Sequence, residues 1–175
     1  MKRPAGVAAS LAIGLLCIVP CARAEPSLSA PKFSVTGGVG NSLGWFGVQA
    51  EPYFGDGRFS IFGGLGYAPP LDEPETASGT IAVAGGGRVF FGGRLYRLFI
   101  EGSISLIGLE SLSTVDGSSQ QASRYGPGLQ VGFQLLSGKG VTIVGSVGVG
   151  YAVGAHSDKT SVLLGLGVGY TWRAH

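Results

Sequence analysis

Three ionisable residues, Glu51, Arg88 and Glu101, lie deep inside apolar stretches of the chain, and they are the first candidates for chemistry. Arg88 and Glu101 lie on either side of a tight-turn sequence at residues 92–94, so we expect them within reach of each other on one hairpin. A buried charge without a partner is costly, which makes pairing the expected arrangement. Three glutamines have similar surroundings: Gln49, Gln130 and Gln134. Such a group can line or gate a pore, or fill a narrow interior as a polar plug. We favour the plug.

The sequence offers little for catalysis or metal binding. His156-Ser157-Asp158 holds the side-chain types of a nucleophilic relay, but consecutive loop residues cannot easily place the histidine between nucleophile and acid. The only other histidine is His175. A phosphate-binding loop requires a helix directly after its glycines, and no helix is expected after the glycines of this chain. The acidic segment 72–75 would attract calcium only weakly. We expect no catalytic residue, no metal and no cofactor.

The elements that position these residues have a period of two. In residues 162–172, the large side chains of Leu164, Leu166 and Val168 alternate with Gly165, Gly167 and other residues that are mostly small. This period is that of a β-strand, because successive side chains of a strand point to opposite faces. One face of this strand is continuously apolar, and the other is nearly bare.

The same alternation predicts eight strands in all. We place them at residues 32–40, 44–54, 59–67, 80–91, 96–108, 125–135, 141–153 and 162–172. Tight turns are expected at Gly55-Asp56-Gly57, where Asp-Gly favours a hairpin, and at residues 92–94 and 137–140. Longer loops are expected at residues 68–79, 109–124 and 154–160, and a very short outer connection at residues 41–43. Alternating short and long connections indicate an antiparallel up-and-down barrel.

The composition predicts that this barrel lies in a membrane. The 175 residues include 33 glycines, and 45% are hydrophobic while only 13% are charged. Mean hydropathy is +0.35, yet no apolar run reaches the roughly 18 residues of a membrane helix. A water-exposed wall would need many charges, whereas the small face suits the narrow interior of an eight-stranded barrel. We therefore expect the large apolar face to contact lipid.

The first 24 residues read as a secretory signal peptide with a basic start, an apolar middle and a small-x-small site at residues 22–24. Both cysteines, Cys17 and Cys21, lie within it. Residues 25–31 would be a short periplasmic leader, 32–172 the transmembrane barrel and 173–175 a tail. Without Lys2, Arg3 and Arg23, the 12 basic residues fall to 9 against 10 acidic residues, a net charge of −1. Nothing indicates a nucleic-acid partner.

Aromatic residues and charges sort toward the two rims of the predicted barrel. Aromatic rings cluster near the strand ends, as expected at membrane interfaces. Basic residues fall at the tight turns and the tail, and acidic residues in the longer loops. The residues concerned are Arg58, Arg94, Lys139 and Arg173 at the inner rim, and Asp72, Glu73, Glu75, Glu110 and Asp116 at the outer rim.

The signal peptide, the eight alternating strands and the aromatic closing strand together resemble the small outer-membrane barrels of the OmpA/OmpX type. In that class the last strand carries a signal read by the barrel-assembly machinery, and Gly167, Tyr170 and Trp172 match its spacing. Gly165 replaces the usual polar residue, and residues 173–175 extend beyond the usual aromatic end. The resemblance implies a location in the cell outer membrane, with lipid and the assembly machinery as partners.

Three functions are compatible with this resemblance. We favour a non-enzymatic surface protein, with the barrel as anchor and the loops at residues 68–79 and 109–124 recognising or adhering to an extracellular ligand. The alternative is a narrow, porin-like channel for small solutes. A lipid A-modifying enzyme is a third reading, but the His-x-Ser pattern that the deacylases of this class would show on a strand is absent.

Overall fold

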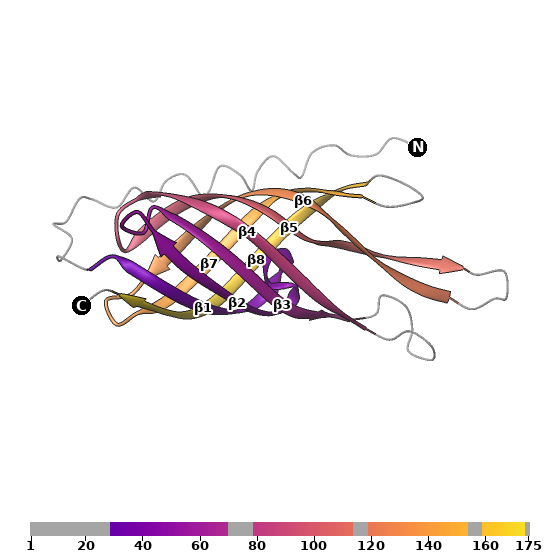
Figure 1. Cartoon of the computed structure of the whole chain (residues 1–175), viewed down its shortest axis with the longest axis horizontal. Helices are drawn as coiled ribbons and strands as arrows, with labels where there is room; N and C mark the ends of the chain where they lie inside the picture. Colours follow the sequence, from indigo (N-terminus) through magenta and orange to yellow (C-terminus); the bar gives the residue numbers. More distant parts are fainter. Residues whose placement is uncertain (1–28, 70–78, 114–118, 154–158, 174–175) are drawn as a thin grey trace, which may run out of the picture.

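A computed structural model describes residues 29–69, 79–113, 119–153 and 159–173, without the side chains of residues 109–122 and 159. Its strands form one closed antiparallel barrel, in which each strand pairs with the next and β8 pairs with β1 (Figure 1). The predicted eight-stranded up-and-down barrel is confirmed. The strands are β1 (Pro31–Gly40), β2 (Trp45–Phe54), β3 (Phe59–Ala68), β4 (Thr80–Gly92), β5 (Tyr96–Ser113), β6 (Ser119–Leu136), β7 (Val141–Ala152) and β8 (Lys159–Arg173). No helix within the described residues is long and apolar enough to cross a bilayer.

Side chains alternate between the outside of the barrel and its lumen, as the period of two predicts. On β8, Leu164, Leu166 and Val168 point outward with about three-fifths of their surface exposed, whereas Leu163 is fully buried. Large apolar side chains on the other strands are exposed in the same way, from 37% at Phe33 to 72% at Ile81. The outward direction of the large apolar face is therefore confirmed.

Tight turns gather at one end of the barrel, which we call the turn end; the opposite end is the ribbon end. At the turn after β2, Gly55, Asp56 and Gly57 all adopt positive φ angles of 57°, 57° and 84°. This conformation favours glycine, so the Asp-Gly signal was sufficient to place the turn.

The longest predicted loop is mostly strand. The sequence indicated a polar loop over residues 109–124, but β5 and β6 remain paired through Ser113 and Ser119. They form a two-stranded ribbon that projects beyond the other hairpins (Figure 1). The loop prediction was wrong because a polar sequence signals contact with water, and a ribbon that leaves the barrel wall meets water whether it is looped or paired.

A β-bulge near the base of this ribbon changes the alternation of β5. The register with β6 shifts between Leu106 and Gly108, and both Leu106 and Ile107 are buried. The sequence pattern predicts Leu106 on the outward face. That prediction was wrong because an extra residue in one strand breaks the two-residue alternation. Leu106 instead packs with Ala68 and Ala82 inside the barrel.

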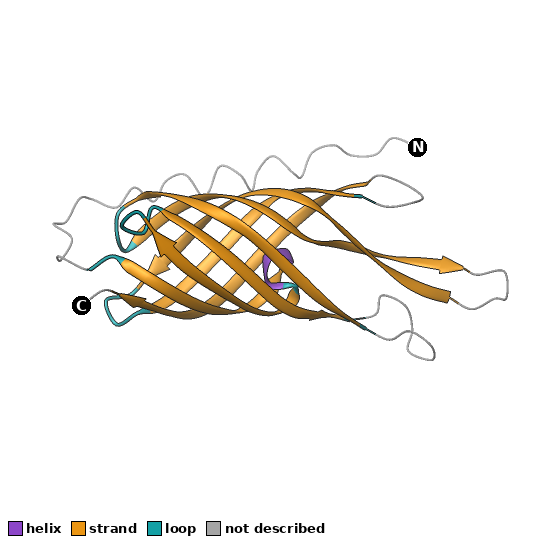
Figure 2. Ribbon diagram, in the orientation of Figure 1, coloured by secondary structure: helices purple, strands orange, loops and turns teal. Residues whose placement is uncertain are grey.

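The connection between β1 and β2 folds into the lumen. It is a short 3-10 helix, η1 (Asn41–Leu43), which lies within the barrel in Figure 2. Ser42 and Leu43 are 3% and 5% exposed. The Asn41 side chain donates from Nδ2 to the Leu106 carbonyl at 2.9 Å, and its Oδ1 accepts the Leu164 N–H at 3.4 Å. The connection lies at the expected end of the barrel, but it folds into the lumen instead of staying at the rim.

Glycines on the lumen face leave the space that η1 occupies. A Cβ atom at Gly47 would lie 2.1 Å from the Leu43 carbonyl oxygen, and one at Gly64 would lie 2.4 Å from that of Ser42. A Cβ atom at Gly66 would lie 2.3 Å from the Gly44 carbonyl oxygen. Real Cβ atoms do not approach this closely, so these glycines are required by the inward connection.

Candidate functional site

Four neighbouring strands align one row of polar residues across the lumen. The register pairs Ser60 with Arg88, Arg88 with Glu101, and Glu101 with Gln130. All four residues are on the lumen parity and are at most 4% exposed. The row exists because strands in direct register place side chains of equal parity side by side.

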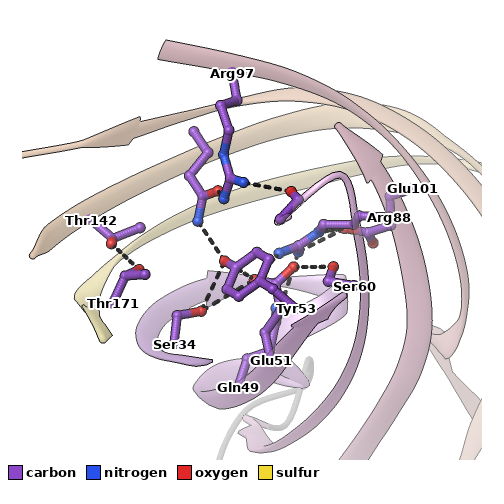
Figure 3. Close-up of polar contacts among 12 residues, drawn as sticks. Ser34, Gln49, Glu51, Tyr53, Ser60, Arg88, Arg97, Glu101, Thr142 and Thr171 are labelled. Carbon is purple, nitrogen blue, oxygen red and sulfur yellow. Dashed lines mark hydrogen bonds and ion pairs between the residues drawn. The ribbon is translucent and has the colours of Figure 1, made fainter. Parts of the chain in front are cut away.

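Arg88 is the centre of the polar contacts in the lumen (Figure 3). Its Nη2 lies 2.7 Å and its Nε 2.8 Å from Oε2 of Glu101, so two guanidinium nitrogens share one carboxylate oxygen. Its Nη1 lies 3.0 Å from Oε2 of Glu51. Nη2 also donates to Oε1 of Gln49 at 3.3 Å. The expected Arg88–Glu101 pair is thus present, and Glu51 joins it from β2.

Both carboxylates have further donors. Glu51 accepts from Ser60 Oγ at 2.6 Å, Tyr53 Oη at 2.9 Å and Ser34 Oγ at 3.3 Å. Glu101 accepts from Gln130 Nε2 at 2.8 Å. These donors, together with the shared Arg88 cation, stabilise two buried carboxylates in a low-dielectric interior.

Arg97 and Tyr53 extend this cluster toward the turn end, although sequence reasoning did not include them in it. Arg97 donates from Nη1 to the Gly57 carbonyl at 2.7 Å and from Nη2 to Oε1 of Gln134. Gln134 in turn donates to Tyr53 Oη at 2.8 Å. Arg97 and Tyr53 have the same lumen parity as Arg88, and that signal was sufficient to find them.

Aromatic rings enclose the two cations. The Arg88 guanidinium carbon lies 4.7 Å and 4.8 Å from the ring centroids of Phe62 and Phe99. That of Arg97 lies 4.1 Å from the Phe90 centroid. Ring faces attract cations at such distances. Two arginines and two glutamates therefore form a lumen cluster of zero formal charge.

All six predicted cluster residues, Gln49, Glu51, Arg88, Glu101, Gln130 and Gln134, belong to this one network. A cavity of about 10 Å³ lies between the network and η1, lined in part by Thr36, Leu43 and Gln49. That is room for about one water molecule. The described residues contain no group of three or more side chains able to hold a metal ion.

The predicted assembly residues lie on β8, at and near the seam that closes the barrel. Gly167 is paired with Gly38 of β1 and Val144 of β7. Tyr170 and Trp172 point outward, with their rings 5.0 Å apart, and Trp172 lies 5.7 Å from the ring of Phe33. These rings form an aromatic group near the turn end.

Several predictions fall outside the described residues. These are the signal peptide, most of the leader, the His156-Ser157-Asp158 segment, His175 and the acidic segment at residues 72–75. Their sequence-based interpretations remain predictions.

No protein-family model, no curated protein and no solved structure matches the chain. Its class is therefore defined by its own geometry. The chain is a closed eight-stranded antiparallel up-and-down β-barrel, with an apolar outer face and a lumen filled by a neutral polar network and an inward-folded connector.

Proposed function

We propose that this protein is an outer-membrane β-barrel that serves as a non-enzymatic membrane anchor. The observation that carries the proposal is the continuous exposed apolar face around a polar interior. Soluble proteins rarely expose large contiguous apolar patches, whereas strands paired around a closed barrel bond their backbone groups to one another, as hydrocarbon requires. Lipid would surround the wall, and the barrel-assembly machinery would read β8.

Two successive barriers favour an anchor over a channel. On the turn side, the Arg88 network fills the lumen with bonded side chains. On the ribbon side, η1 occupies the space opposite Gly47, Gly64 and Gly66. A solute would have to displace both, because the space between them is about 10 Å³.

Recognition is assigned to the ribbon end. The β5–β6 ribbon extends beyond the barrel wall (Figure 1) and offers two strand edges and two faces to the surroundings. Exposed strand edges can pair with a further strand of another protein. An extracellular ligand would meet this ribbon before it met the wall.

Membrane fractionation combined with unheated detergent gels tests the location. We expect the protein in the outer-membrane fraction, as a compact band that shifts on boiling. A soluble periplasmic protein without that shift would overturn the proposal.

Planar-bilayer recording tests the anchor against the channel. We expect no steady single-channel steps for the wild type. Steady steps that become larger in Arg88→Ala would establish the channel instead. Lipid A mass spectra that change on overexpression, compared with an empty vector, would establish an enzyme.

A further inference from the structure

Three arginines lie at the turn end of the barrel: Arg94, Arg97 and Arg173. Arg173, at the end of β8, donates from Nη2 to the Ser137 carbonyl at 3.0 Å. The turn that carries Arg94 reaches the same place, because the Leu136 N–H donates to the Leu95 carbonyl at 2.8 Å. The β4–β5 turn and the end of β8 therefore meet beside the β6–β7 turn.

Like charges act on one another within this group. The charge of Arg94 disfavours the charged form of Arg173, and the charge of Arg173 acts in the same way on Arg97. Arg97 is already included in the zero formal charge of the lumen cluster, so Arg94 and Arg173 add two positive charges beyond it. The other charged residues described at this end are three basic and one acidic: Lys32, Arg58, Lys139 and Asp56.

Two of these arginines have guanidinium nitrogens without an acceptor. Arg97 is only 6% exposed; its Nη1 and Nη2 donate to Gly57 and Gln134, but its buried Nε has no partner. On Arg173, both Nε and Nη1 are buried without a partner. Neither arginine forms an ion pair within the described residues. Because buried charged donors are costly when unmatched, this place favours an anion with several acceptor oxygens.

Arg88 shows the arrangement that these two arginines lack. Its nitrogens contact the carboxylates of Glu51 and Glu101, whereas Arg97 and Arg173 bond only neutral carbonyl and amide oxygens in the part of the chain that the structure describes. Glu51 is the carboxylate whose charge acts on Arg97, and it is itself bonded to Arg88. The turn-end charge is therefore not balanced by the lumen carboxylates.

We propose that the turn-end arginines bind one phosphate group, with Arg94 and Arg173 as its outer ligands and Arg97 as the inner one. Guanidinium N–H groups match the geometry of phosphate oxygens, and the negative charge of the phosphate offsets the charge that Arg94 and Arg173 add. Arg94 is exposed and Arg173 half-buried, so the anion can approach from outside the barrel. Inorganic phosphate and the phosphate of a lipid headgroup share this chemistry. The site does not require a membrane location, since it is defined by charges and donors of this chain alone.

Calorimetric titration of inorganic phosphate into the folded protein in detergent, at constant ionic strength, tests the proposal. We expect one saturable site per chain. Arg173→Gln should raise the Kd at least about tenfold, because it removes charge-assisted hydrogen bonds, and Arg94→Gln should raise it as well. The matched control is Lys159→Gln, which removes one positive charge at the opposite end of β8 and should leave the Kd unchanged.

The compact unheated band verifies folding of each variant, and Arg94→Gln, at an exposed turn residue, replaces Arg173→Gln if the latter does not fold. Displacement of bound phosphate by a short-chain phosphatidylglycerol would identify a lipid headgroup as the ligand, and no displacement would identify inorganic phosphate. A wild type without saturable binding, unchanged binding in both arginine variants, or equal weakening in Lys159→Gln would overturn the proposal. A protein absent from the outer membrane would instead refute the proposed function and leave phosphate binding in detergent unaffected.

Discussion

Arg88 is the central residue of the polar network in the lumen. It joins Glu101, Glu51 and Gln49 from three strands and lies between the rings of Phe62 and Phe99. Its removal would leave two buried carboxylates with hydroxyl and amide donors but without their cation. The net contribution of such a pair is small compared with the cost of breaking it.

Arg88→Leu should therefore lower the free energy of unfolding by about 3 to 5 kcal/mol, measured by urea titration in vesicles. Glu101→Gln in the same chain should restore part of the loss, because it removes one uncompensated charge. Arg58→Leu, at an exposed turn residue, is the control and should change stability by less than about 0.5 kcal/mol. Equal effects of Arg88→Leu and Arg58→Leu would contradict the central role of Arg88.

A charged substitution at Leu166 tests which face of the wall contacts lipid. It points outward near the middle of β8, with 59% of its surface exposed. Leu166→Arg should cost about 2 to 4 kcal/mol in bilayers if the residue lies near the midplane. Val141→Arg, opposite Tyr170 near the turn end, should cost about 0 to 1 kcal/mol because it lies close to the interface. The same urea titration compares the two, and equal costs would contradict a membrane-embedded wall.

Among the elements, the β1–β2 connector has the most unusual position. Its backbone fits into the lumen because β2 and β3 carry glycine at Gly47, Gly64 and Gly66. The side chain of Asn41 in this connector forms hydrogen bonds to the Leu106 carbonyl of β5 and the Leu164 N–H of β8, on two sides of the barrel. A three-residue connection thus replaces the side chains that would otherwise fill the ribbon side of the lumen.

Gly66→Val should disturb this arrangement, because its Cβ would meet the carbonyl oxygens of Gly44 and Leu43 within 2.5 Å. We expect a loss of about 1 to 3 kcal/mol and a weaker compact band on unheated gels. Gly63→Val is the matched control on the same strand, since nothing lies within 4 Å of a Cβ atom there. If both variants behave like the wild type, the connector does not occupy the lumen.

The whole molecule consists of two parts, a closed barrel wall and the β5–β6 ribbon that extends from it. The wall is closed by the β1–β8 seam, whereas β5 residues from Leu109 onward pair, within the part of the chain that the structure describes, only with β6. An isolated two-stranded hairpin is marginally stable in water, so the ribbon contributes little to the barrel. Its length beyond the wall fits a role in contact with partners.

Deleting residues 111–121, with Asn-Gly joining Glu110 to its registered partner Ala122, should leave the heat-modifiable band intact. The free energy of unfolding should change by less than about 1 kcal/mol, because marginal hairpin pairing is all that is removed. Urea titration measures the change, and full-length protein is the reference. Loss of the compact band would show that the ribbon is needed to form the wall.

Local sequence patterns were enough to predict the eight strands, their outward and lumen faces, the Asp-Gly turn and the Arg88–Glu101 pair. These features follow from a period of two and from tight-turn chemistry, and both are local. The same parity would have included Arg97 and Tyr53 in the lumen cluster. A period of two cannot anticipate an extra residue, which is why the bulge at Leu106 was missed.

The inward path of residues 41–43 could not be predicted from the sequence and is seen only in the folded barrel. A three-residue connection has the same local sequence whether it lies at a rim or in a lumen. Its inward path depends on empty volume opposite glycines of other strands and on bonds from Asn41 to Leu106 and Leu164, which are 65 and 123 residues away in sequence. Volume and contacts of this kind exist only after the wall has closed, so no local pattern contains them.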